Sequence, residues 1–227
     1  MAAKRGIVDA ATGHEMASKA LRAFMREAEP YLKANTDMTL GHMALMALLT
    51  RGHAFHEAVM REIKQDNPFS TFALLRSYAE NAAVMAWLTS RPMELIRLGP
   101  LATERDRFKI GPLVAAATNE LPGFRKVYEY LSGYSHPSHL GLLASYAVAP
   151  NDESGRFRWQ SRPRFRSDEE LLQAYLLLVE LAEVNGTFWG NLTDAYIAYL
   201  PNVPEEDRIA TQTDFGVGEP PPFEEDE

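Results

Sequence analysis

The stretch FALLRSYAENAAVMAWL, residues 72–88, is the most apolar segment of the chain and decides its fold class. It is nearly long enough to cross a membrane, but it carries Arg76, Glu80 and Asn81. A helix that is apolar on most sides and holds a few charges is typical of the centre of a helical bundle. Pro68 follows Asn67 directly and favours the first turn of a helix. The sequence therefore predicts a buried helix over about 68–89.

Helical spacing of apolar residues extends outward from this segment in both directions. It predicts helices over about 14–34, 39–64 and 120–134, with Pro30 expected to kink or split the first. A last helix begins after Ser167, where acidic residues fill the first turn, and continues to about Leu200. We therefore expect an all-α bundle of four to five long helices, with a single domain over 13–200 and a flexible N-terminus over 1–12.

One segment before the last helix has a different pattern. Residues 144–150 and 156–161 are rich in aromatic and β-branched residues, and the polar run Asn151–Gly155 separates them. Polar turn residues between two such runs indicate a β-hairpin. We expect a small hairpin over about 144–161, inserted into the bundle before its last helix.

Composition excludes several classes of protein. The chain of 227 residues contains no cysteine, which excludes disulfide scaffolds, thiolate zinc sites and cysteine nucleophiles. It has no glycine-rich phosphate loop and no Gly-x-Ser-x-Gly motif, so we expect no cofactor. The start of the chain lacks the apolar core of a signal peptide, and no uncharged apolar run reaches membrane-spanning length. These features predict a soluble cytoplasmic protein without a membrane partner.

The net charge of −8 is concentrated at the C-terminus. Residues 201–227 contain nine acids and one base, so residues 1–200 are electrically balanced. This segment is rich in proline and poor in large apolar residues, which predicts a disordered acidic tail. The tail could serve solubility, or it could dock on a basic patch.

The segment RFRWQSRPRFR, residues 156–166, is such a basic patch. Arginine forks bind phosphates and aromatic rings offer stacking platforms for bases, which makes this segment a candidate for binding RNA or a protein partner. The alternative is a half-buried strand with its aromatic side chains inward. The candidate binding residues are Arg156, Arg158, Trp159, Arg162, Arg164 and Arg166.

Two groups of polar residues are candidates for catalysis. Arg76 and Glu80 are four residues apart and share one face of the central helix. Arg125, Tyr128, Ser132 and His136 are spaced as one stripe of a helix, and a histidine at a helix C-terminus beside these groups is suited to acid–base work. The alternative is that Arg76 and Glu80 form a structural pair and that His136 caps a helix end.

Histidine pairs give a weaker indication of a metal site. His53 and His56 form one His-x-x-His pair, and His136 and His139 form another. His42 lies three helical turns before His53 and therefore shares its face. Neutral imidazoles bind transition metals, but histidines of the core or the surface explain the pairs as well. We therefore predict no metal and keep His53, His56, His136 and His139 as weak candidate ligands.

Two segments together resemble a known family. These are LLRSYAENAAVMAWL (74–88), with its Arg-x-x-x-Glu helix, and YEYLSGYSHPS (128–138), with its Tyr-x-x-Leu-Ser-x-x-x-His-Pro-Ser run. They are similar to a family of uncharacterised bacterial all-helical proteins related to the HEPN superfamily. The resemblance implies a homodimeric helical bundle, either a metal-independent ribonuclease or a non-catalytic binding domain. The Arg-to-His spacing of HEPN nucleases occurs here literally only at Arg51 and His56.

Two hypotheses for the function follow. The first is a non-catalytic, homodimeric interaction protein of HEPN-like type that acts in bacterial or phage defence. The second is a HEPN-like, metal-independent ribonuclease acting on structured RNA. In the ribonuclease hypothesis His136 is the acid or base, and Arg76 or Arg125 holds the phosphate.

Overall fold

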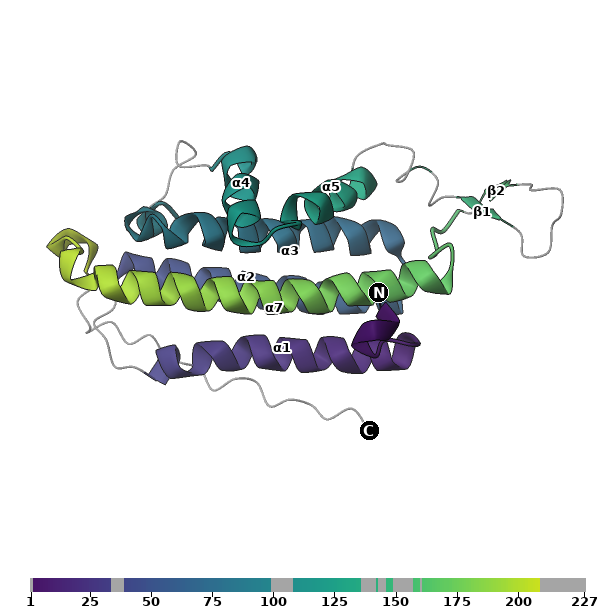
Figure 1. The fold of residues 1–227 in the computed structure, drawn as a ribbon, viewed down its shortest axis with the longest axis horizontal. Coiled ribbons are helices and arrows are strands. Elements are labelled where there is room, and N and C mark those ends of the chain that lie inside the picture. Colours follow the sequence, from purple (N-terminus) through teal and green to yellow (C-terminus); the bar gives the residue numbers. More distant parts are fainter. Residues whose placement is uncertain are drawn as a thin grey trace.

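The computed structural model describes residues 2–33, 39–98, 108–135, 142, 146–148, 157–159 and 161–208. Its long helices run side by side as a bundle: α1 (Ala10–Lys33), α2 (Leu40–Lys64), α3 (Pro68–Thr89) and α7 (Asp168–Tyr199) (Figure 1). Two shorter helices, α4 (Ile110–Glu120) and α5 (Phe124–Ser135), cover α3 on its other side. The predicted all-α class is confirmed.

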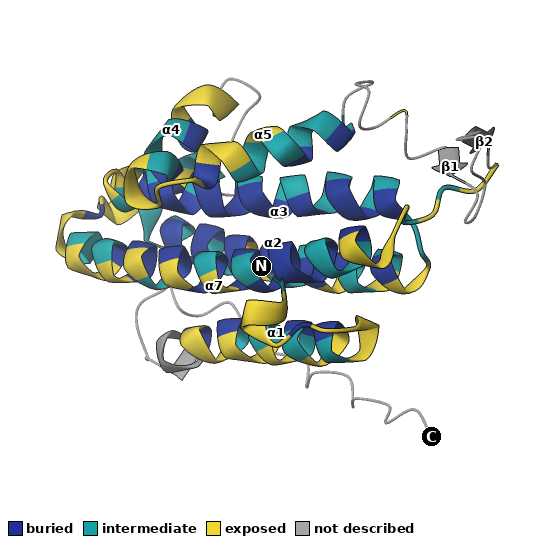
Figure 2. Ribbon diagram, turned by 45° about the vertical axis from the view of Figure 1, so that its right-hand side comes forward, coloured by how far each residue is buried: buried dark blue, intermediate teal, exposed yellow. Residues whose placement is uncertain are grey.

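Helix α3 lies at the centre of the molecule, as its sequence predicts. It packs against α2 and α7 on one side and against α4 and α5 on the other, so most of its surface is buried (Figure 2). Helix α1 packs mainly on α7 and keeps its outer face exposed. The 3-10 segment η2 (Pro92–Leu98) follows α3 and buries Leu95 at the same end of the bundle as the C-terminus of α7.

Polar residues fix the starts of three long helices. The side chains of Thr39, Asn67 and Ser167 each accept a hydrogen bond from a backbone N–H in the first turn, which satisfies a donor that the helix leaves open. Helices α3 and α7 therefore begin where their capping residues predict. Helix α1, in contrast, continues through Pro30 without splitting.

A buried pair of asparagines joins α3 to α7. Asn81 donates to the Asn185 side chain at 3.0 Å, and Asn185 donates to the carbonyl oxygens of Leu181 and Tyr78. Both asparagines are buried, and burying an amide is costly unless it is hydrogen-bonded. The glycine-flanked segment around Asn185 is therefore a polar link in the core, and α7 passes through it unbroken.

Both ends of the chain are more ordered than their composition suggests. Residues Ala2–Arg5 form the 3-10 turn η1, and Ile7 is fully buried. At the other end, Leu200–Asn202 and Glu205–Asp207 form the 3-10 turns η4 and η5, and Val203 is buried between them. Buried apolar residues hold both of these segments on the bundle. The remainder of the predicted acidic tail, residues 209–227, lies outside the described residues.

The region between α3 and α5 contains the helix α4, which the sequence analysis did not predict. Gly111 and Pro112 lie in the first turn of α4, where a proline is tolerated. Pro122 lies in the turn between α4 and α5, where Gly123 has a φ of +102°. The helix predicted over 120–134 therefore begins only at Phe124, because the left-handed Gly123 separates it from α4.

Two short strands precede the last helix. Strand β1 (Tyr146–Val148) pairs antiparallel with β2 (Phe157–Trp159), with Ala147 opposite Arg158. The strands lie beyond the end of the bundle (Figure 1). Residues 149–156, which would form their connection, lie outside the described residues.

Candidate functional site

The sequence-predicted pair Arg76 and Glu80 meets Tyr128 where α5 crosses α3. Arg76 Nε lies 3.2 Å from Glu80 Oε1, and Arg76 Nη2 donates to the Tyr128 hydroxyl at 3.0 Å. The same hydroxyl donates to Glu80 Oε1 at 3.0 Å. These three residues, here called the Tyr128 cluster, therefore form a closed triangle of one ion pair and two hydrogen-bonded contacts between two helices.

The Tyr128 cluster lies at the surface rather than in the core. The side chains of Arg76 and Glu80 remain 23% and 30% exposed. The Arg76 guanidinium also lies 5.4 Å from the centre of the Tyr128 ring. The cluster thus combines an ion pair, a shared phenol and a cation–π contact, all of which hold α5 on α3.

The other predicted catalytic residues do not join this triangle. Arg125 is exposed at the start of α5 and forms no hydrogen bond or ion pair within the described part of the chain. The hydroxyl of Ser132 is buried one turn after Tyr128 and has no hydrogen-bond partner among the described residues. His136 lies outside the described residues. Of the six predicted catalytic residues, the structure brings together Arg76, Glu80 and Tyr128.

A second cluster of the same composition lies near the other end of α5. Arg166 Nη2 donates to Glu170 Oε1 at 2.6 Å and to the Tyr134 hydroxyl at 2.9 Å. Tyr134 in turn donates to Glu170 Oε1 at 2.8 Å. The backbone N–H of Arg166 also donates to Glu170 Oε2 at 2.7 Å. These residues, here called the Tyr134 cluster, tie α5 to the first turn of α7.

The glutamate and the tyrosine of the Tyr134 cluster are more buried than those of the Tyr128 cluster, whereas its arginine, at 34% exposed, is not. The Glu170 side chain is only 6% exposed. Burial raises the pKa of Glu170, but the hydrogen bonds from Arg166 and Tyr134 outweigh it and leave the pKa below its ordinary value. The hydrogen bond to Glu170 likewise raises the pKa of Arg166, and burial raises that of Tyr134. Glu170 is therefore ionised and Tyr134 neutral at neutral pH.

Aromatic rings surround the Tyr134 cluster. The ring of Phe72 stacks on Tyr134 with centroids 4.0 Å apart, and Phe165 meets Phe72 edge-on at 6.2 Å. Phe165 and Arg166 both belong to the arginine-rich segment. The end of that segment therefore packs on the bundle through Phe165, although residues 161–166 do not form a strand.

The arginine-rich segment divides into a fixed end and an exposed part. Arg166 is engaged by Glu170 and Tyr134, so it does not offer a free charge to a partner. Arg162 is exposed and has no partner among the described residues, and Arg164 is 71% exposed with one long contact to Asp66. Arg158 and Trp159 lie on β2, and Arg156 lies outside the described residues.

The predicted histidine pairs do not converge. His56 is fully buried, and its Nε2 bonds to the Ala17 carbonyl oxygen at 3.0 Å, whereas His53 contacts Glu57 at 3.6 Å. Burial lowers the pKa of His56 to about 4. His139 lies outside the described residues, and across the described ranges no three potential ligands lie close enough to hold a metal ion.

His42 and Arg51 make contacts within the fold. His42 is buried and accepts the backbone N–H of Thr39 at Nδ1, which completes the cap of α2. Arg51 stacks over the Phe55 ring at 4.7 Å and is exposed. His56 faces the interior whereas Arg51 is exposed, so the two residues with the literal Arg-to-His spacing do not meet on one surface.

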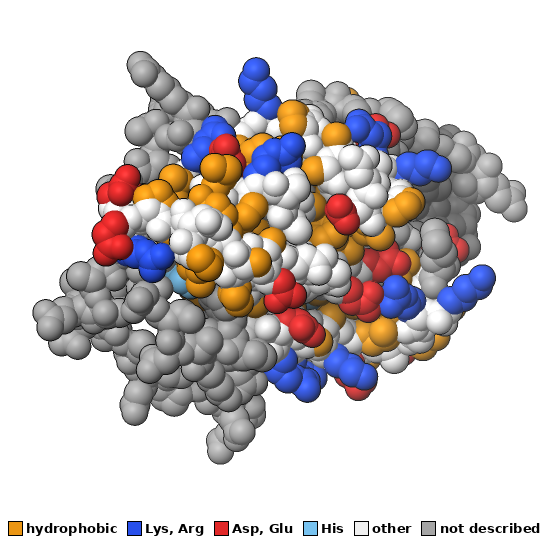
Figure 3. Space-filling model, turned by 60° about the vertical axis from the view of Figure 1, so that its left-hand side comes forward, with side chains coloured by type: hydrophobic (Ala, Val, Ile, Leu, Met, Phe, Trp, Pro, Cys, Tyr) orange, Lys and Arg blue, Asp and Glu red, His pale blue; other side chains and the backbone are white. Residues whose placement is uncertain are grey.

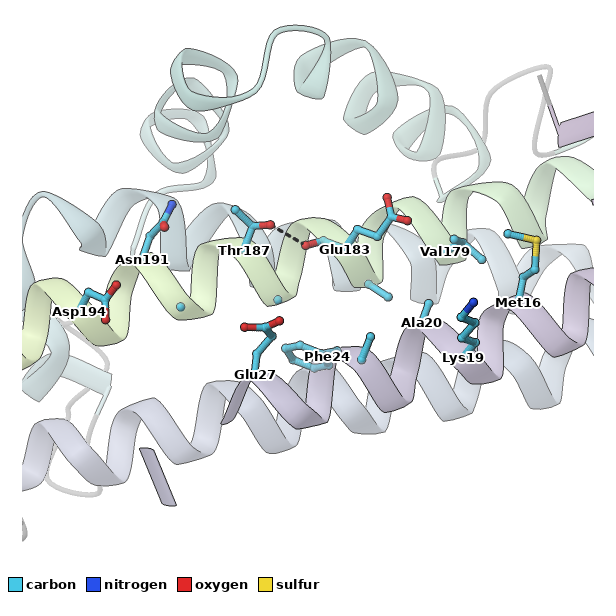
Figure 4. A pocket seen from close by; sticks show the side chains of 14 residues that line it. Met16, Lys19, Ala20, Phe24, Glu27, Val179, Glu183, Thr187, Asn191 and Asp194 are labelled. Atoms are coloured by element: carbon cyan, nitrogen blue, oxygen red, sulfur yellow. Dashed lines mark hydrogen bonds between the residues drawn. The ribbon is translucent and has the colours of Figure 1, made fainter. Parts of the chain in front are cut away.

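A groove of about 630 Å³ runs between α1 and α7 (Figure 4). Its apolar lining includes Phe24 and Val179, and its charged residues are Lys19, Glu27, Glu183 and Asp194. The sequence analysis picked none of these residues, and the groove contains no histidine or arginine. Its position also separates it from both clusters on α5.

Apolar side chains gather at the end of the bundle formed by η2 and the C-terminus of α7 (Figure 3). Met93, Ile96 and Ile197 are 57%, 39% and 45% exposed, and a hollow of about 270 Å³ lies beside them. Scattered exposed apolar residues are ordinary, but a group at one end suits contact with another protein surface.

The sequence analysis treated Glu170 only as an acidic residue beside the arginine-rich segment and did not name Glu170 or Tyr134 as site residues, although a signal for Glu170 existed. Arg166 and Glu170 repeat the Arg-x-x-x-Glu spacing of Arg76 and Glu80.

Comparison with known proteins adds nothing to this geometry, because no family model, curated protein or solved structure matches the chain. Across the described ranges, every helix is too short or too polar to cross a membrane.

Proposed function

We propose that this chain is a non-catalytic helical interaction protein of HEPN-like type, which acts as a cytoplasmic homodimer in bacterial or phage defence. The Tyr128 cluster carries the proposal. Of the two guanidiniums that would hold a phosphate in the ribonuclease hypothesis, that of Arg76 lies 3.2 Å from a carboxylate and shares a phenol with it. Its charge therefore serves to hold α5 on α3. The proposal includes the bundle of four to five helices and the β-hairpin inserted before the last helix.

The exposed part of the arginine-rich segment is the contact for an anionic partner. Arg162 and Arg164 point their charge at solvent, and residues 1–200 carry no net charge. The attraction is therefore local to this segment, and weak enough to depend on salt. The apolar end around Met93 and Ile96 is the candidate contact between two copies.

An RNA-cleavage assay tests the non-catalytic part of the proposal. Purified protein is incubated with total tRNA, with and without EDTA, beside His136→Ala and Tyr128→Phe. We expect the RNA to stay intact in every sample. Cleavage that survives EDTA and is lost in His136→Ala would overturn the proposal in favour of a metal-independent ribonuclease. Cleavage that EDTA abolishes would overturn it in favour of a metal site.

Two further measurements test the interactions. Light scattering on the eluting protein should give twice the chain mass of 25.5 kDa, and a monomer would contradict the homodimer.

Retention on a heparin column should fall when Arg162 and Arg164 are replaced by alanine. The matched control removes two exposed arginines of α1, Arg22 and Arg26, and should leave most of the retention. Equal losses in both variants would contradict a local contact.

A further inference from the structure

The residue after the C-cap of α2 has an unusual backbone. Asp66 has a φ of +59°, and no other non-glycine residue in the described ranges has a positive φ. Its N–H donates to the Ile63 carbonyl oxygen at 3.0 Å, and the N–H of Asn67 donates to that of Glu62 at 3.0 Å. This is the hydrogen-bond pattern of a helix end that normally takes glycine. A side chain in this conformation costs about 1 kcal/mol.

Glycine fills the other positive-φ positions that the structure describes, Gly6 and Gly123. At Gly123 an added Cβ would meet no atom within 4 Å. Asp66 differs because its side chain has partners. Backbone strain that persists beside specific side-chain contacts points to a role for that side chain.

The carboxylate of Asp66 holds the arginine-rich segment, which lies 99 residues further along the chain. Its Oδ1 accepts the backbone N–H of Phe165 at 2.9 Å, and its Oδ2 lies 3.8 Å from Arg164 Nε. The next residue, Arg166, is bound by Glu170, and the Phe165 ring packs on Phe72. Three contacts therefore hold the end of the segment on the bundle, and the contact with Asp66 is one of them.

We infer that Asp66 is a positioning residue that sets the direction of the arginine-rich segment and presents Arg162 and Arg164 to a phosphate-bearing partner. The inference rests on the proposed function, in which these arginines contact an anionic partner. The Asp66–Arg164 contact is long, and Arg164 stays 71% exposed, so a phosphate reaches its guanidinium without breaking the hydrogen bond to Phe165. A fixed segment loses less conformational entropy on binding than a free one.

Two substitutions separate this role from a structural one. Asp66→Gly relieves the backbone strain but removes the carboxylate. Asp66→Asn keeps an oxygen acceptor for Phe165 and a residue type that tolerates a positive φ. We expect Asp66→Gly to leave the urea midpoint unchanged or raised while the segment loses its fixed direction. Asp66→Asn should keep that direction.

Two spin labels report the direction of the arginine-rich segment as a distance between the segment and α5. The full chain has no cysteine, so cysteines introduced at the exposed positions Ser161 and Glu129 take labels at the segment and on α5. Electron–electron distance measurements should give one narrow distribution in the parent and in Asp66→Asn. The distribution should be about twice as broad in Asp66→Gly, since that variant loses the hydrogen bond that fixes the segment. A distribution in Asp66→Gly as narrow as in the parent would overturn the inference.

Binding of a poly(U) RNA of about 20 nucleotides separates this inference from the proposed function. We expect Asp66→Gly to bind about fivefold more weakly than the parent and Asp66→Asn to bind like it. If replacing Arg162 and Arg164 leaves the RNA affinity of the protein unchanged, the proposed contact is wrong. The distance distributions still decide whether Asp66 fixes the segment. Broadened distances with unchanged RNA affinity would overturn the role of Asp66 in presenting the arginines.

Discussion

The Tyr128 and Tyr134 clusters contain the same three residue types and differ in depth. Each pairs an arginine with a glutamate four residues later and adds a tyrosine from α5. In the Tyr128 cluster the glutamate is 30% exposed, whereas in the Tyr134 cluster it is 6% exposed. The second glutamate also accepts a backbone N–H, from Arg166. The same three residue types thus form a cluster around a partly exposed glutamate in one place and around a buried glutamate in the other.

This difference in burial predicts how much each cluster contributes to the stability of the fold. A buried carboxylate must keep its partners, because an unpaired charge in the interior costs several kcal/mol. A partly exposed carboxylate exchanges its partners for water at little cost. The Tyr134 cluster is therefore expected to carry stability, and the Tyr128 cluster is the one whose loss the fold tolerates.

The largest expected effect comes from removing each glutamate in turn. Glu170→Ala leaves the Arg166 guanidinium and the Tyr134 hydroxyl without their shared acceptor, and should lower the free energy of unfolding by about 3 kcal/mol. Glu80→Ala should lower it by about 1 kcal/mol, because water replaces the lost contacts. Urea denaturation monitored by circular dichroism measures both.

Glu129→Ala is the control, since this glutamate is exposed on the same helix α5. It should change the free energy of unfolding by less than about 0.5 kcal/mol. Equal losses in Glu170→Ala and Glu80→Ala would show that depth does not distinguish the two clusters.

Acid titration tests the comparison in a different way, because the buried groups titrate in separate windows. The pKa of His56 is lowered to about 4 in the folded chain, so the unfolded chain binds this proton first as the pH falls. The free energy of unfolding should drop by about 3 kcal/mol between pH 6.5 and 4. Burial lowers the pKa of His42 and adds to this loss.

Glu170 acts only at lower pH. Its folded pKa is below the ordinary value, so its stabilisation is present above the unfolded pKa near 4.5 and is lost as the pH falls through the folded pKa. Urea midpoints measured from pH 7 to 3 should therefore show two slopes. Replacing His56 with glutamine should remove most of the upper slope and keep the lower one. A lower slope that survives in Glu170→Gln would contradict the assignment.

Removing the phenol hydroxyls gives a smaller effect of the same kind. Tyr134→Phe loses a donor to Glu170 and an acceptor for Arg166, and should cost about 1.5 kcal/mol. Tyr128→Phe should cost about 0.5 kcal/mol, because its partners remain joined by their own ion pair and are partly hydrated. A double-mutant cycle with the matching glutamate shows how far each phenol acts through that carboxylate.

Local signals explain what the sequence predicted well. The bounds of α3 follow from Asn67 and Pro68, and the start of α7 follows from Ser167 and the acids after it. Arg76 and Glu80 are neighbours on a helix whatever surrounds them, so their pairing was predictable. Tyr128 was predictable as part of a helical stripe, although its contact with α3 was not.

Contacts between distant segments explain what the sequence did not predict. Glu170 meets Tyr134 across 36 residues, and Asp66 meets Phe165 across 99. No periodicity in the sequence encodes such pairs. The placement of residues 201–208 likewise depends on contacts that composition does not reveal: Val203 is buried at the end of the bundle, and Arg208 forms a β-bridge with the distant Thr39. Composition alone assigned that segment to the acidic tail because proline and charge dominate it.

The smallest expected effect concerns two serines on α5, between and beside the two phenols. The Ser132 hydroxyl is buried with no hydrogen-bond partner among the described residues, whereas Ser135 donates to the Leu131 carbonyl oxygen at 3.2 Å. An unpaired buried hydroxyl costs more than a methyl group in its place. Ser132→Ala should therefore raise the free energy of unfolding by about 0.5 kcal/mol, and Ser135→Ala should lower it by a similar amount.

This pair of variants also bears on the catalytic hypothesis. A serine that worked as a nucleophile would need a base within hydrogen-bond distance, and Ser132 has none in the part of the chain that the structure describes. Urea denaturation gives the sign of each change, and the tRNA assay on the same samples gives the activity. If Ser132→Ala proved destabilising, the hydroxyl would have a partner in the folded protein, and α5 would present a polar site between its two phenols.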